Sequence, residues 1–184
     1  MICLKLTTRT SSFQVEVDAT PADCGVANIT SYDANDHQKA WASAARKMDS
    51  TLEEEIQIEE IIGSVRLDLC ETLVKLLKLK GINYPQTFSE KTGLYDGLYN
   101  KIANGKQQTM KRDTLMAIAV GLGLTSHATQ ELMKKAGISL NALKDPDRTY
   151  LTILERFPGT DLYNANCFLE ARNLPPLGSK YRDF

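Results

Sequence analysis

The sequence predicts a mainly α-helical protein with a small β element at its N-terminus. From Asp36 onward, apolar residues recur three and four positions apart, which is the spacing of amphipathic helices. Glycine, proline and asparagine interrupt this spacing often, so we expect many short helices. Residues Phe13–Val17 instead alternate apolar and polar side chains, as half-buried strands do. We therefore expect a β-hairpin or meander within residues 1–35, either packed on the helices or acting as a dimer arm.

The composition is that of a globular protein. The 184 residues are 42% apolar and 24% charged, which is ordinary for a folded domain. No apolar run reaches the roughly 18 residues that a membrane helix needs. The first twelve residues lack an apolar run of secretory length, so we expect a cytoplasmic protein.

The sequence contains no pattern typical of a catalytic or metal site. Its cysteines stand singly and without a CxxC pair, as Cys3, Cys24, Cys70 and Cys167. Such isolated thiols are typical of half-buried or buried side chains. The Gly121–Gly123 run resembles part of a dinucleotide-binding motif, but it follows a predicted helix and lacks the third glycine. We therefore expect no enzyme activity, no metal and no cofactor.

Charge is distributed unevenly along the chain. Residues 1–60 contain 5 basic and 11 acidic side chains, a net charge of −6, whereas residues 61–144 contain 12 basic and 6 acidic, a net charge of +6. Residues 145–184 are close to neutral, at −1. A basic central segment favours contact with phosphate groups.

Residues 36–64 are predicted to form a helical connector. We expect one helix over Lys39–Met48 and a second, acidic helix over Leu52–Ile62, separated by a cap at Asp49–Thr51. The clearest amphipathic helix follows at Val65–Lys80, where leucines form one face and Gly81 ends the helix.

The stretch from Asn83 to Leu124 predicts three further helices. The first runs over Pro85–Thr92 with Asn83 as its cap, the second over Asp96–Ala103, and the third over Lys111–Leu122. A turn of about three or four residues that contains Gly93 joins the first two, which is the pattern of a helix-turn-helix unit. In that unit the second helix enters the major groove of DNA.

The second helix of this stretch has one apolar and one polar face. Leu98, Tyr99 and Ile102 are predicted to face inward. The outward positions are Tyr95, Asp96, Gly97, Asn100, Lys101 and Asn104. Asparagine can pair with adenine and lysine with guanine or phosphate, whereas aspartate suits only cytosine or a helix cap. Basic residues on the flanks suit phosphate contacts, and these are Lys106, Lys111 and Arg112.

Three more helices are predicted towards the C-terminus. They cover Ala128–Ala136 with Ser126 as cap, a segment from Asp145-Pro146 to Phe157, and a segment from Asp161 to about Asn173. We therefore divide the chain into a β element (1–35), the connector (36–64), a helical domain (65–177) and a tail (178–184).

The run TFSEKTGLYDGLYNKIANGK, followed by DTLMAIAVGLGLT, resembles the Cro/phage-repressor type of helix-turn-helix, the XRE family. The later segments ATQELMKKAG, YLTILERF and NANCFLEARNLPPLG are similar to uncharacterised regulators of Gram-positive mobile elements. The resemblance covers roughly Leu67 to Leu177. It implies a five-helix bundle, here with extra C-terminal helices, that binds an operator as a homodimer. By position, it implies base contacts from Tyr95, Asp96, Gly97, Asn100 and Lys101 and phosphate contacts from Gln86 and Thr87.

Two functions remain open at this point. The first is a sequence-specific transcriptional regulator, a repressor that binds a pseudo-palindromic operator in double-stranded DNA. The alternative is a protein-interaction module, antitoxin-like, in which the bundle is a scaffold and the N-terminal β region engages a protein partner.

Overall fold

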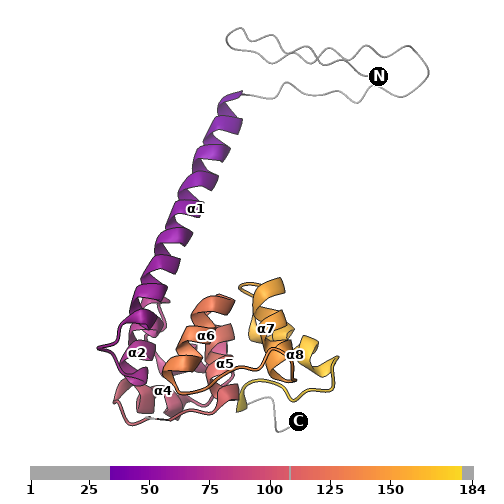
Figure 1. The fold of residues 1–184 in the computed structure, drawn as a ribbon. Helices are drawn as coiled ribbons and strands as arrows, with labels where there is room; N and C mark the ends of the chain where they lie inside the picture. The colour runs from indigo at the N-terminus through magenta and orange to yellow at the C-terminus, as the bar shows by residue number, and fades with distance from the viewer. Residues whose placement is uncertain (1–33, 108, 180–184) are drawn as a thin grey trace, which may run out of the picture. The chain divides into compact units, whose positions relative to one another are not determined.

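The computed structural model describes residues 34–107 and 109–179 of the chain (Figure 1). Over these residues it has eight helices and no strand, so the mainly α class is confirmed. The predicted β element lies outside the described residues, except for its last two positions, which begin the first helix. The helices are α1 (Ala34–Gly63), α2 (Leu69–Leu79), α3 (Pro85–Thr92), α4 (Asp96–Ala103), α5 (Arg112–Gly121), α6 (Ser126–Lys135), α7 (Asp147–Arg156) and α8 (Leu162–Glu170).

The chain divides into two compact units, residues 1–53 and 54–184, and the boundary falls within α1. The sequence predicted two helices here, and that prediction was wrong because α1 is continuous through Asp49–Thr51. The Ser50 and Thr51 hydroxyls do not cap a new helix. Both donate to the carbonyl oxygen of Lys47, at 2.9 Å each, as these residue types do inside a helix.

Helix α2 begins later than its apolar pattern predicted. The sequence suggested a start at Val65, but the first helical residue is Leu69. Asp68 and Glu71 form a capping box: the Glu71 amide donates to Asp68 Oδ1 at 2.7 Å, and the Asp68 amide donates to Glu71 Oε2 at 3.2 Å. This reciprocal pair satisfies two of the free amides at the start of a helix and fixes the boundary.

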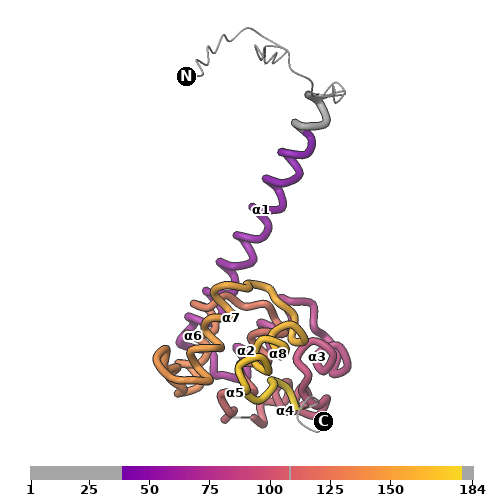
Figure 2. The backbone as a smooth tube through the Cα atoms, turned by 90° about the vertical axis from the view of Figure 1, so that its right-hand side faces the viewer, coloured from indigo at the N-terminus to yellow at the C-terminus, as the bar shows by residue number. Residues whose placement is uncertain are grey.

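Within the second unit, α2 to α8 gather into one bundle (Figure 2). Helix α5 is apolar on nearly every side, and its residues 115–120 are all buried. A helix buried all round lies inside a core rather than on its surface. Helices α3, α6 and α8 pack directly on α5, so α5 is the support on which the outer helices are placed.

Gly121, at the end of α5, permits a close approach to α3. A Cβ atom at this position would lie 2.6 Å from the carbonyl oxygen of Lys91 and 2.9 Å from Cγ2 of Thr92. No side chain fits in that space, so the glycine serves backbone packing. The end of α3 is thereby held against α5.

The segment after α8 folds back on the turn between α3 and α4. Leu177 is fully buried and exchanges two hydrogen bonds with the Asn166 side chain, at 2.7 and 3.0 Å. Gly178 follows with φ +87°, and a Cβ atom there would lie 2.9 Å from the carbonyl oxygen of Gly93. The turn after α3 is therefore covered by chain more than eighty residues downstream.

Candidate nucleic-acid interface

Helices α3 and α4 are joined by a three-residue turn whose polar groups are satisfied internally. Gly93 ends α3 with φ +62°, and its amide donates to the Ser89 carbonyl oxygen. The Ser89 hydroxyl donates to the carbonyl oxygen of Leu94 at 2.5 Å, and the Thr92 hydroxyl donates to that of Phe88 at 2.7 Å. Leu94 is buried between the helices. These bonds hold α3 and α4 in one fixed arrangement.

The start of α3 differs from the prediction. The sequence suggested Asn83 as its cap, but the capping position is Tyr84, which makes no side-chain capping bond. Pro85 occupies the first helical position, where its missing amide hydrogen leaves no bond unmade. The boundary therefore depends on the proline and needs no polar cap.

Helix α4 has the two faces that its sequence predicted. Leu98 and Ile102 are buried, and the half-buried Tyr99 ring packs on Phe88 with 5.8 Å between the ring centroids. The opposite side, which we call the exposed α4 face, consists of Tyr95, Asp96, Gly97, Asn100, Lys101 and Asn104. Gly97 is half-buried, and the other residues of this face are exposed.

Tyr95, Gly97 and Lys101 form a single cluster on this face. Lys101 Nζ donates to the Tyr95 hydroxyl at 3.2 Å and lies 5.6 Å from the centre of its ring. A Cβ atom at Gly97 would lie 3.1 Å from Cε2 of Tyr95, so the ring rests where a longer side chain would be. The family resemblance implied a base contact at Gly97. In the free protein the Tyr95 ring occupies that space.

The remaining predicted contact residues lie around this face. Gln86 and Thr87 are in the first turn of α3, and Nε2 of the Gln86 side chain donates to Glu90 Oε1 at 3.2 Å. Nδ2 of the Asn104 side chain donates to the Asn100 carbonyl oxygen at 2.7 Å. Lys106 and Lys111 are exposed, and Lys111 is the residue that precedes α5. Their ammonium groups add positive charge to the end of α4 and the start of α5.

Arg112, for which the sequence suggested a phosphate contact, forms ion pairs within the protein. Its guanidinium forms a 2.8 Å ion pair with Asp147, which is 7% exposed, and a longer contact of 3.5 Å with Asp113. An ion pair with a buried carboxylate is costly to break. The sequence missed this pair because 35 positions separate its members and no local pattern connects them.

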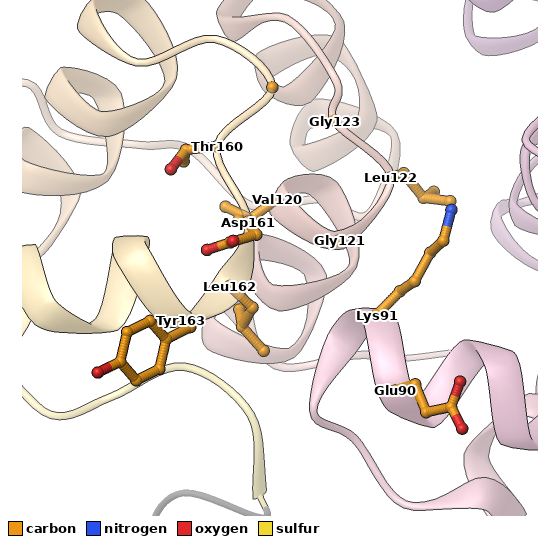
Figure 3. Close-up of a pocket in the computed structure, with 11 residues that line it drawn as sticks. Glu90, Lys91, Val120, Gly121, Leu122, Gly123, Thr160, Asp161, Leu162 and Tyr163 are labelled. Atoms are coloured by element: carbon orange, nitrogen blue, oxygen red, sulfur yellow. The ribbon is translucent and has the colours of Figure 1, made fainter.

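A pocket of about 490 Å³ lies beside α3, away from the predicted contact residues, none of which lines it. Glu90 and Lys91 form one side, residues 120–123 form its back, and residues 159–163 form the other side (Figure 3). Asp161 is occupied as the cap of α8, where its carboxylate accepts from the Asn164 amide at 2.8 Å. The sequence gave no sign of this pocket, because three separate segments create it.

The described residues contain no group of three His, Cys, Asp or Glu side chains that could hold a metal ion. Of the two cysteines described, Cys167 is exposed and Cys70 is buried. Burial raises the pKa of the Cys70 thiol, which donates to the carbonyl oxygen of Gln107 at 2.8 Å. Its thiol form is therefore favoured over the reactive thiolate.

Comparisons of the chain with protein-family models, with curated proteins and with solved structures find no match. Among the described helices, none is both long enough and apolar enough to cross a membrane.

Proposed function

We propose that this protein is a sequence-specific DNA-binding transcriptional regulator, with α3 and α4 as a helix-turn-helix of the Cro/phage-repressor type and α4 as the recognition helix. The observation that carries the proposal is the exposed α4 face: a row of polar side chains on a helix whose other side is buried and whose preceding turn is fixed by internal hydrogen bonds. The protein would act as a repressor in the cytoplasm.

The residues of the exposed α4 face suit base contacts of different kinds. Asn100 can form two hydrogen bonds with adenine, and Lys101 can donate to guanine. Lys101 would exchange its hydrogen bond with the Tyr95 hydroxyl for a bond to a base acceptor, or for a stronger bond to an anionic phosphate. Asp96 lies in the first turn of α4, where its charge favours the helix dipole.

Phosphate contacts would come from around α4. Gln86 and Thr87 present side chains from the first turn of α3, and Lys106 and Lys111 supply positive charge. Such contacts carry affinity without sequence information and weaken as salt displaces them. As a homodimer, the protein would place two α4 helices on half-sites about 34–36 Å apart, one turn of DNA.

Selection from a pool of random DNA duplexes, followed by fluorescence anisotropy on the enriched sequence, tests the proposal. The full chain is expected to enrich a pseudo-palindrome and to bind it less tightly as salt rises. Replacing Asn100 and Lys101 together with alanine should weaken specific binding by about 100-fold, because each base contact contributes about 1–3 kcal/mol.

A matched control removes the same residue types elsewhere. Asn164 on α8 and Lys134 on α6 are both exposed, and their combined replacement with alanine should leave DNA affinity unchanged. If no sequence is enriched, or if both double variants bind alike, the proposal is wrong.

Gly97→Ala is expected to weaken DNA binding without lowering the stability of the fold. Alanine favours a helix over glycine by up to about 1 kcal/mol, but the added Cβ displaces the Tyr95 ring and with it Lys101. We expect thermal unfolding at an equal or higher temperature together with roughly tenfold weaker DNA binding. Gly63→Ala, where a Cβ meets no atom within 4 Å, is the control and should leave DNA binding intact. Equal DNA affinity for both variants would remove the Tyr95–Lys101 cluster from the interface.

The alternative, a protein-interaction module, has its own supporting observation. Residues 1–60 have a net charge of −6, and α1 exposes large apolar side chains, including Met48 and Leu52. An acidic, partly apolar region suits a protein partner better than DNA. Isolation of the native protein in a stoichiometric complex with another protein, and without nucleic acid, would favour this function.

A further inference from the structure

Helix α1 exposes an apolar stripe. Residues 41, 45, 48, 52 and 56 are spaced four, three, four and four apart, so they share one face of the helix. Met48, Leu52 and Ile56 are 73%, 57% and 49% exposed. Trp41 is on the same face at 71% exposure, and Ala45 lies between them. Contiguous exposed apolar side chains mark surfaces that bind another molecule.

The stripe differs from the face that α1 gives to its own core. Ile58 and Ile62 are 5% and 4% exposed and belong to the core of the second unit. At 100° per residue their positions point about 120° and about 80° away from that of Leu52 around the helix. Burial of Ile58 and Ile62 therefore leaves Met48, Leu52 and Ile56 exposed.

The charges of α1 are separated along its length. Residues 34–48 contain three basic side chains and one acidic, whereas residues 49–63 contain six acidic side chains and no basic one. Glu54 pairs with Lys80 at 2.7 Å, which leaves five acidic residues in that half without a lysine or arginine partner among the described ion pairs. The basic half of α1, residues 34–48, is therefore complementary in charge to the acidic half, residues 49–63.

We propose that α1 docks on α1 of a second copy of this chain, with the two helices antiparallel and Met48 close to the two-fold axis. In this register Leu52 lies against the small Ala45 of the other copy. Arg46 and Lys47 then lie within about one helical turn of the other copy's Glu53 along the helix axis. A parallel pair would instead set two acidic halves side by side, and like charges at flanking positions oppose that orientation.

The inference does not rest on the proposed DNA binding, and its tests contain no DNA. Sedimentation of the full chain at increasing concentration is expected to show a dimer. Met48→Glu should raise the dissociation constant by at least about 100-fold, because each dimer would lose two buried methionine side chains.

Ser43→Glu adds the same charge on the opposite face of α1, where residue 43 is exposed, and should leave the dimer intact. Circular dichroism and thermal unfolding confirm that both variants fold. A wild-type chain that remains a monomer at about 100 µM, or two variants that dimerise equally, would overturn the proposal. The first outcome would also fit a stripe covered by residues of the same chain.

Disulfide formation then tests the orientation. With Cys3, Cys24 and Cys167 replaced by serine, Ala45→Cys and Leu52→Cys chains are oxidised singly and as a mixture. Antiparallel helices bring position 45 of one copy opposite position 52 of the other, so the mixed disulfide is expected and the two homodisulfides are not. Homodisulfides at both positions would show a parallel pair and overturn the antiparallel arrangement.

Discussion

Replacing Phe88 with alanine is expected to lower the free energy of unfolding of the second unit by about 3–5 kcal/mol. Phe88 has no exposed surface, and its ring packs on Tyr99 of α4. Alanine removes a large apolar group from the contact between α3 and α4 and leaves a cavity. Urea unfolding, followed by circular dichroism, measures the loss.

Tyr163→Ala is the matched control for this prediction. It also removes an aromatic ring, but Tyr163 is 68% exposed, and we expect a change within about 0.5 kcal/mol. If Phe88→Ala cost no more than this control, α3 and α4 would not share the core described above. Phe88→Leu, which retains most of the volume, should lie between the two.

The bounds of α3 and α4 could be predicted from the sequence because their signals are local. Pro85 starts α3, Gly93 stops it, and Asn104-Gly105 stops α4, each acting within one turn of the boundary. Where two neighbouring residues offer the same signal, the prediction is less sharp. At α6 the sequence favoured Ser126 as the cap, but the Thr125 hydroxyl accepts the Ala128 amide.

Local sequence patterns also predicted wrong helix boundaries in two places, in α1 and at the start of α2. Asp49, Ser50 and Thr51 read as a cap, yet α1 continues through them because serine and threonine hydroxyls can also bond within a helix. The apolar pattern of α2 extended back to Val65, which is 98% exposed and lies before the capping box. Periodicity shows which residues can share a face but not where the helix begins.

The residues of the exposed α4 face could be predicted from the sequence, because the apolar Leu98 and Ile102 indicate which side of the helix faces the core. Both are buried in the structure. The contacts on that face were not predicted. Tyr95 precedes α4, its ring lies against Gly97, and its hydroxyl accepts a hydrogen bond from Lys101. The six positions between Tyr95 and Lys101 are not the spacing of a regular helical pair. Contacts between distant segments, such as Arg112 with Asp147, likewise have no signature in a single sequence.

The contact between Asn166 and Leu177 leads to the second large expected effect. The Asn166 side chain is 8% exposed, accepts the Leu177 amide at 2.7 Å and donates to its carbonyl oxygen at 3.0 Å. Asn166→Ala leaves both of these buried backbone groups without a partner. Because each unsatisfied group costs about 1–3 kcal/mol, we expect a loss of roughly 2–6 kcal/mol in the free energy of unfolding.

The same substitution should loosen the turn between α3 and α4, since Gly178 covers Gly93 only while Leu177 is held in place. Hydrogen exchange is expected to quicken at the Leu177 amide and then at the Leu94 amide, while the buried amides of α5 stay protected. Asn164→Ala, an exposed asparagine on the same helix, is the control and should change neither stability nor exchange. If Asn166→Ala matched this control at Leu94, the C-terminal segment would cover the turn without stabilising it, and the position of α4 would depend on α3 and α5 alone.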